Sequence, residues 1–200
     1  MIDKNELRRI AHDKRNKLEF KDELSRSILG KFVSLPEYIS ASTVMFYIDV
    51  RSEVRTCNAL AEALRSNKKI VVPWCDDDER LKLFHLENID ELELGMYGIL
   101  EPSKELRHIH EKQAYVYDID LIMVPGVAFD TRGARMGHGK GYYDKLLGEA
   151  YPETRVVALA FECQMFDEIP VEPHDVFMHK IITEHNIYSN DVCNSNWVVF

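Results

Sequence analysis

Cysteine is scarce in this sequence, and a long apolar run is missing. Four cysteines, Cys57, Cys75, Cys163 and Cys193, stand far apart and form neither a C-x-x-C pair nor a zinc-binding spacing with histidine. No stretch approaches the ~20 apolar residues of a membrane span, and the N-terminus lacks the apolar segment of a signal peptide. We therefore expect a cytoplasmic protein with reduced thiols and no membrane contact.

A surplus of positive charge is also missing. The formal net charge is −9, whereas domains that bind nucleic acid usually carry a basic surplus on one face. We expect no nucleic-acid partner, and an anionic ligand would have to be held by a local cluster of positive groups. A length of 200 residues, 46% of them hydrophobic, is ordinary for one globular domain covering residues 1–200.

Helix-like and strand-like patterns alternate along the chain. Apolar residues at helical spacing predict helices from Leu7 to Leu18 and from Leu24 to Leu35, the second ending at Pro36. Further helices are expected at 57–64 and 142–149, and short apolar runs predict strands at 43–48, 70–73, 81–86, 121–125 and 156–161. The alternation favours an α/β fold with a mostly parallel sheet and helices on both faces.

Six of the nine glycines fall between Gly126 and Gly148, where a predicted strand gives way to a predicted helix. Open α/β sheets bind ligands at such junctions. In the segment from Gly137 to Gly141, alternate glycines let main-chain N–H groups approach a polyphosphate, and the following helix directs its positive end there. Lys140 and Arg135 add charge, so the segment predicts a site for a phosphate-bearing ligand, ATP above all. The alternative is a flexible surface loop with a solvated lysine.

The loop is not a Walker A motif, because Gly141 follows Lys140 in place of the hydroxyl residue that would hold Mg²⁺. Nor does it match G-x-G-x-x-G, which disfavours a dinucleotide. Another oxygen must therefore ligate the Mg²⁺ that accompanies ATP, and Asp144 is close in sequence. The alternative role of Asp144 is to stabilise the first turn of the helix.

The stretches Val124 to Asp130 and Arg135 to Asp144 resemble the signature of the 5-formyltetrahydrofolate cyclo-ligase family, also called methenyltetrahydrofolate synthetases. Further agreement comes from Lys4, Leu7, Arg8 and Arg15, and from the stretches 47–53, 95–102 and 181–184. The resemblance implies a single-domain, three-layer α/β/α fold of the Rossmann-like NagB/RpiA type. It also implies an ATP- and Mg²⁺-dependent reaction that converts 5-formyltetrahydrofolate to 5,10-methenyltetrahydrofolate with release of ADP and phosphate.

The resemblance also implies roles for individual residues. ATP would be bound by Lys4, Arg8, Arg135, Met136, Gly137, His138, Gly139, Lys140, Gly141, Tyr142 and Tyr143. The folate substrate would meet Ile48, Glu53, His138, Gly139, Lys140, Gly141 and Tyr142, with Glu53 accepting hydrogen bonds from pterin N–H groups. Arg135, Lys140 and Tyr142 would be the catalytic residues, and Asp144 the metal ligand. No protein nucleophile is needed, so Cys57 and Cys163 would be bystanders.

Two positions depart from the family pattern. His138 stands where the family usually has arginine, and His179 stands where a second aspartate near the metal is expected. Asp175, one helical turn earlier, is a possible substitute. The segment 190–200 is a candidate C-terminal extension. Two rival functions remain open, a phosphate-binding isomerase and a non-catalytic module for folate or nucleotide, and we expect a monomer or weak dimer with small-molecule partners only.

Overall fold

The computed structural model describes residues 3–76, 78, 80–95 and 98–190. Its largest sheet has the strand order β13-β12-β10-β7-β1-β2-β3-β6. The strands are β1 (Thr43–Met45), β2 (Lys69–Cys75), β3 (Leu81–Leu86), β6 (Gln113–Ala114), β7 (Leu121–Val124), β10 (Arg155–Leu159), β12 (Lys180–Ile182) and β13 (Ile187–Ser189). The pairs from β12 through β10, β7 and β1 to β2 are parallel, and β13, β3 and β6 are antiparallel to their neighbours.

The order of the parallel strands creates a switch point between β1 and β7. The chain passes from β1 to β2 on one side, and later adds β7, β10 and β12 on the other side of β1. The segments that follow β1 and β7 therefore leave the sheet in different directions. In open α/β sheets this divergence at the carboxyl ends of the strands forms the crevice in which ligands bind.

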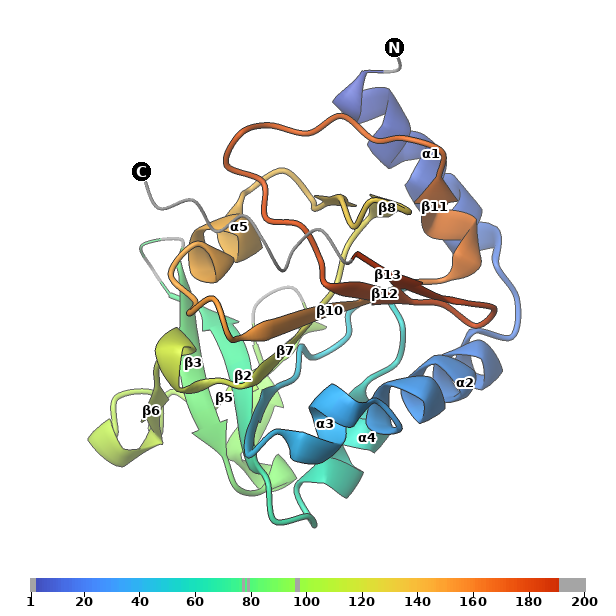
Figure 1. Ribbon diagram of the computed structural model, residues 1–200. Coiled ribbons are helices and arrows are strands. Elements are labelled where there is room, and N and C mark those ends of the chain that lie inside the picture. Colours follow the sequence, from blue (N-terminus) through green and yellow to red (C-terminus); the bar gives the residue numbers. More distant parts are fainter. Residues whose placement is uncertain (1–2, 77, 79, 96–97, 191–200) are drawn as a thin grey trace.

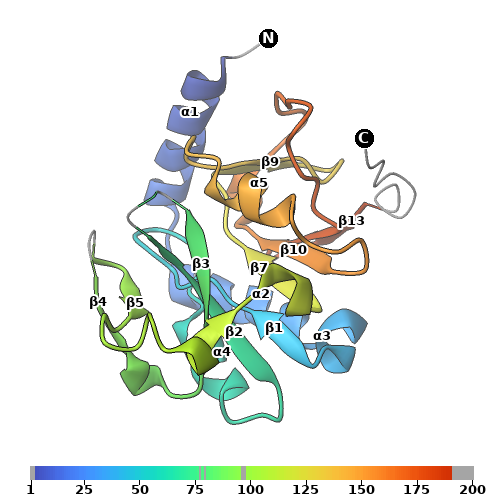
Figure 2. The same cartoon turned by 90° about the vertical axis from the view of Figure 1, so that its left-hand side faces the viewer.

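Helices and a small second sheet cover the two faces of the main sheet. One face carries α2 (Lys21–Val33), α3 (Pro36–Ser40) and α4 (Cys57–Ala63), whose apolar side chains form one core cluster with the strands. The other face carries α5 (Tyr142–Leu147), with Leu146 and Leu147 in a second cluster. Figures 1 and 2 show α5 and α2 to α4 on opposite sides of the sheet.

The small sheet lies above the same face as α5 and has the order β11-β8-β9. Its strands are β8 (Ala128–Asp130), β9 (Arg135–Met136) and β11 (Met165–Phe166). Helix α1 (Lys4–Lys17) packs on it, with Leu7 and Ala11 buried against Val127, Ala134 and Met136. The first helix of the chain is thereby fixed beside the segment that leads into the glycine loop.

Short elements complete the described part of the chain. They are the hairpin β4 (Leu92–Leu94) and β5 (Leu100–Pro102), and the 3-10 helices η1 (Ile89–Glu91), η3 (His110–Lys112), η4 (Val116–Asp118) and η5 (Glu162–Gln164). In the described part of the chain, no helix has the length and apolar character needed to cross a membrane. Of the candidate extension at 190–200, all but Asn190 lies outside the described residues.

The predicted α/β class and mostly parallel sheet are confirmed, with local corrections. Pro36 does not simply end the second helix but opens α3, because proline needs no hydrogen-bond partner for its nitrogen in a first turn. The strand expected at 43–48 ends at Met45, and the one expected at 70–73 extends to Cys75. One outer layer is built largely from the small sheet, which the sequence patterns did not predict.

Candidate active site

The glycine loop, Gly137 to Gly141, joins β9 to α5. Gly139 and Gly141 have φ of +100° and +68°, in the left-handed region that favours glycine, and Gly141 is the N-cap of α5. A Cβ at Gly137 would lie 3.1 Å from Nη1 of Arg135. The backbone conformation favours glycine at positions 139 and 141, and the nearby Arg135 side chain leaves little room for a Cβ at position 137. Together the three glycines set the path of the loop.

Helix α1 supplies the positive groups that face this loop. Arg8 donates from Nε to the carbonyl oxygen of Gly137 at 3.0 Å, and its guanidinium lies 3.5 Å from where a Cβ on Gly139 would be. Lys4 lies one turn earlier, with Nζ 2.7 Å from Oε1 of Glu172 and 3.9 Å from Oδ2 of Asp175. Arg8 is thus brought to the loop across 129 residues of sequence, whereas Lys4 pairs with the carboxylates of the segment 172–175.

Two hollows border the glycine loop. One is lined by Pro125, Gly126, Arg135, Gly137, His138, Lys140, Gly141, Tyr142, Tyr143 and Asp144. The second is lined by Gly139, Lys140, Gly141, Asp144, Lys145 and His174. Lys140 is exposed and borders both hollows, as Gly141 and Asp144 do. Most of the residues predicted to bind ATP therefore line one continuous region around the loop.

Arg135 and Asp144 form an ion pair beneath the loop. Nη2 of Arg135 donates to Oδ1 of Asp144 at 2.7 Å, and the Arg135 side chain is only 2% exposed. Its guanidinium carbon also lies 5.6 Å from the centre of the Tyr143 ring. Burial raises the pKa of Tyr143, so this phenol stays protonated at neutral pH. Arg135 is thus placed to orient Asp144 and Tyr143, and it borders the hollow from below.

The loop after β1 brings Glu53 to the same place. Glu53 is buried, and its Oε2 accepts from the main-chain N–H of Val50 at 3.1 Å. Its Oε1 lies 3.6 Å from Nε2 of His138, in the glycine loop. Ile48, which precedes this loop, is 8% exposed and packs in the core, as does Met136 at 4%. Of the residues predicted to bind folate, Glu53 and His138 therefore lie close together. Ile48, and Met136 on the nucleotide side, expose little side-chain surface to a ligand.

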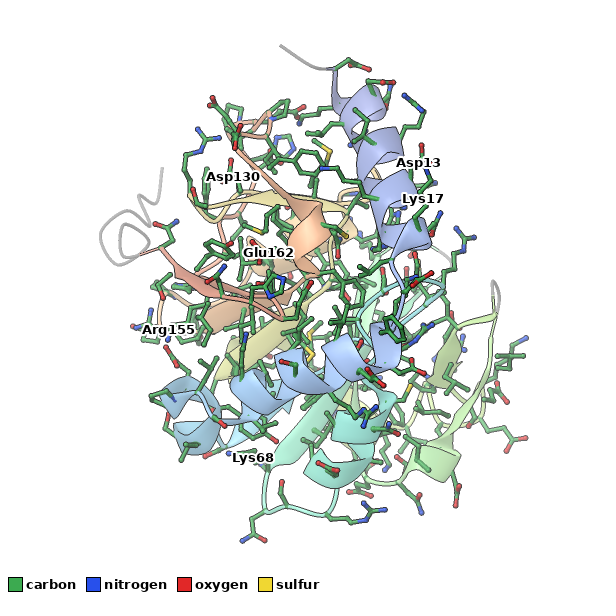
Figure 3. All side chains as sticks on the ribbon, turned by 90° about the vertical axis from the view of Figure 1, so that its right-hand side faces the viewer. Asp13, Lys17, Lys68, Asp130, Arg155 and Glu162 are labelled. Carbon is green, nitrogen blue, oxygen red and sulfur yellow. The ribbon has the colours of Figure 1, made fainter. Side chains whose placement is uncertain are left out.

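Sequence reasoning missed His12. Its ring stacks on that of His138 with centroids 5.3 Å apart. Burial and the nearby cation Arg15 lower the pKa of His12, which favours the neutral imidazole. Lys4, Arg8, His12 and Arg15 recur at helical spacing along one side of α1, a signal that could have found His12. The exposed residues Asp13 and Lys17 of the same helix are labelled in Figure 3.

The two positions considered for a second metal ligand lie in different places. His179 precedes β12 at the amino ends of the parallel strands, where its Nδ1 accepts from the main-chain N–H of Val156 at 3.1 Å. The glycine loop lies at the carboxyl ends, so His179 is not part of this site. Asp175 accepts from the main-chain N–H of Glu172 at 2.7 Å and neighbours Lys4. Among the described residues, no group of three or more metal-ligating side chains is present.

Fold and site define a class of protein: an α/β protein with a glycine loop and a buried carboxylate close together at the switch point of its sheet. Comparison with known proteins then gives the family. Residues 2–184 match the model of the 5-formyltetrahydrofolate cyclo-ligase family, and the chain belongs to that family.

Individual relatives agree with this assignment. A probable 5-formyltetrahydrofolate cyclo-ligase of Schizosaccharomyces pombe is 31% identical over 94% of this chain and 98% of the relative. A 5-formyltetrahydrofolate cyclo-ligase of Escherichia coli K12 is 25% identical over 85% of this chain and 93% of the relative. The solved 5,10-methenyltetrahydrofolate synthetase of Aquifex aeolicus is 30% identical, with a TM-score of 0.80 over 94% of this chain and 93% of that one. The predicted family, fold and cyclo-ligase class are confirmed.

Proposed function

We propose that this enzyme converts 5-formyltetrahydrofolate and ATP to 5,10-methenyltetrahydrofolate, ADP and phosphate, with Mg²⁺ as the metal. The observation that carries the proposal is the meeting of Glu53 and the glycine loop, 3.6 Å apart through His138, at the switch point of the sheet. One side offers main-chain N–H groups and cations for phosphates, and the other offers a buried carboxylate for pterin N–H groups.

The chemistry explains why ATP is needed. A formamide oxygen leaves poorly, because donation from nitrogen deactivates the carbonyl carbon. Transfer of the γ-phosphoryl group to that oxygen releases ADP and turns the oxygen into a phosphate leaving group. The N10 amine of the same folate then attacks the carbon, loses its proton, and the ring closes with expulsion of phosphate. The protein must hold the formyl oxygen in line with the γ-phosphorus and neutralise charge.

The proposed roles follow from position. Lys140 binds a phosphate oxygen from the exposed side of the loop, and Lys4 and Arg8 add charge from α1. Tyr142 orients the folate in the hollow that it lines, and Arg135 acts through its hydrogen bond to Asp144. No thiol is required: burial raises the pKa of Cys57 to about 12, and this cysteine therefore stays protonated.

A magnesium ion fits the carboxylates near the loop. Mg²⁺ is commonly held by one or two carboxylates together with substrate phosphates. Asp144 borders both hollows. Asp175 lies near Lys4 and near His174, and His174 lines the second hollow. These two residues would hold the ion, which supplies charge neutralisation to the transferring phosphoryl group.

The test is a coupled assay with purified protein. Phosphate release from ATP should require added 5-formyltetrahydrofolate and match the absorbance of methenyltetrahydrofolate one for one. ATP hydrolysis without folate, or binding of both ligands without turnover, would contradict the proposal. The second outcome would favour a non-catalytic module, and conversion of a sugar phosphate without nucleotide would favour an isomerase. The single domain over residues 1–200, the monomer or weak dimer, and the cytoplasmic location stay predictions.

A further inference from the structure

Arg15 spans the switch point of the sheet from below the site. Its side chain comes from α1 and is buried, with the residue 3% exposed. Nε donates to Oγ of Ser52 at 3.0 Å, and Nη1 donates to the carbonyl oxygen of Gly126 at 3.1 Å. Ser52 lies in the segment after β1 and Gly126 in the segment after β7, so one guanidinium joins the two segments that diverge there.

Arg15 also interacts electrostatically with Glu53. Burial lowers the pKa of Arg15, and among the neighbouring charged groups Glu53 acts most strongly in the opposite direction. Both residues are buried, at 3% and 5% exposed, so their attraction is weakly screened by solvent. Glu53 follows Ser52 directly, so the hydrogen bond to Ser52 fixes the main chain next to the carboxylate.

The segment that carries Glu53 needs such a fixing point. Arg51 has φ of +56°, a left-handed conformation that is strained for a residue with a side chain. Glu53 closes the turn by accepting from the main-chain N–H of Val50 and donating its own N–H to the Val50 carbonyl oxygen at 3.2 Å. A strained, tightly closed turn persists only where its surroundings hold it. Arg15 holds this turn through its hydrogen bond to Ser52, which lies at the centre of the turn.

The other contact of Arg15 is shared. The carbonyl oxygen of Gly126 also accepts from Nε2 of Gln164 at 2.9 Å, and Gln164 holds the Val127 carbonyl oxygen at 3.0 Å. The segment after β7 is therefore anchored without Arg15. The distinct contribution of Arg15 lies at Ser52 and Glu53, on the folate side of the site.

We propose that Arg15 is a positioning residue for folate, which sets the place of the Glu53 carboxylate and leaves the nucleotide side of the site unaffected. This inference rests on the proposed function, since it takes Glu53 as a folate-binding group. The proposal predicts a selective effect. Substitutions that weaken the contacts of Arg15 should reduce the affinity for 5-formyltetrahydrofolate and leave the affinity for ATP unchanged.

The experiment measures the two dissociation constants separately by calorimetry. Arg15→Lys keeps the charge but cannot reach both oxygen atoms with the planar geometry of a guanidinium. It should weaken 5-formyltetrahydrofolate binding roughly 10-fold and change ATP binding less than about 2-fold. Ser52→Ala removes one hydrogen bond only and should give a smaller loss of the same selectivity.

Arg15→Met tests the charge. It should lower thermal stability, because it removes both hydrogen bonds of the guanidinium and the positive charge that interacts with the buried Glu53. Adding Glu53→Gln should restore much of that stability but not folate binding. The control variant is Arg132→Lys. Arg132 also pairs with a buried carboxylate, that of Asp130, but it lies at the far end of the β8–β9 hairpin. This substitution should leave both dissociation constants unchanged.

Equal weakening of both ligands by Arg15→Lys, or unchanged folate binding, would overturn the role of Arg15. Unaltered protein that binds folate without turnover would overturn the proposed function and leave the Arg15 comparison valid. Unaltered protein that binds no 5-formyltetrahydrofolate would overturn both.

Discussion

At the scale of single residues, Lys140 is the clearest test of the glycine loop. It is exposed and lines both hollows, and its ammonium would make a charge-assisted hydrogen bond to a phosphate worth about 1.5 to 3 kcal/mol. Lys140→Ala should weaken the apparent ATP affinity roughly 10- to 150-fold with thermal stability unchanged. Lys17→Ala, at the end of α1 and in neither hollow, is the control and should leave the ATP affinity unchanged. An unchanged Michaelis constant for ATP would contradict phosphate binding by Lys140.

Asp144 has two possible roles, and its pairing with Arg135 changes how they are separated. Asp144→Asn keeps one oxygen but removes the charge that Mg²⁺ prefers, so activity should fall and partly recover at high Mg²⁺. Stability should fall as well, because the buried Arg135 loses its ionic partner. The dependence of activity on Mg²⁺ is therefore the deciding measurement. A normal Mg²⁺ dependence would make Asp144 a purely structural residue of the helix start.

At the scale of elements, two glycines offer a matched pair of alanine substitutions. Gly139 has φ of +100°, so Gly139→Ala should strain the loop, cost about 1 to 3 kcal/mol and impair ATP binding. Gly30 lies within α2, and a Cβ there would meet nothing within 4 Å. Gly30→Ala should raise the free energy of unfolding by about 0.5 to 1 kcal/mol and leave activity unchanged. Chemical denaturation gives the stability of each variant, and the Michaelis constant for ATP reports its binding. Equal effects of the two substitutions on stability and on ATP binding would contradict a strained loop at Gly139.

Sequence patterns predicted the elements that carry their own periodicity. The helical spacing from Leu7 to Leu18 lies largely within α1, and the apolar runs at 121–125 and 156–161 became central strands. Short strands such as β8 and β9 have three and two residues, too few for any period to be visible. The glycine loop could be read from its glycines, but Arg15 bridging Ser52 and Gly126 could not. That contact depends on strand order, which no local pattern contains.

At the scale of the whole molecule, three histidines that are at least partly buried make stability depend on pH. Burial lowers the pKa of His12, His85 and His179 below the ordinary value in the folded state. At and below about pH 6.5, these histidines are therefore protonated more fully in the unfolded chain than in the folded protein. The free energy of unfolding should decrease from about pH 7 to pH 5 as a result. Each such histidine contributes at most about 1.4 kcal/mol per pH unit.

His179→Gln should reduce that slope in urea titrations at several pH values, whatever it does to stability at neutral pH. His110→Gln, which changes an exposed histidine, is the control. Identical slopes for the unaltered protein and His179→Gln would show that His179 is not one of the groups responsible.

The docking of α1 also bears on the order in which the chain folds. Arg8 meets Gly137 across 129 residues and Arg15 meets Gly126 across 111, so these contacts close some of the longest loops in the chain. Closing a long loop costs more conformational entropy than closing a short one, and local pairs such as β2 with β3 can form first. During synthesis, α1 leaves the ribosome before the strands of the small sheet and has no docking surface until that sheet has been made. The first helix of the sequence is thus among the last to reach its place, and catalytic competence arrives with it.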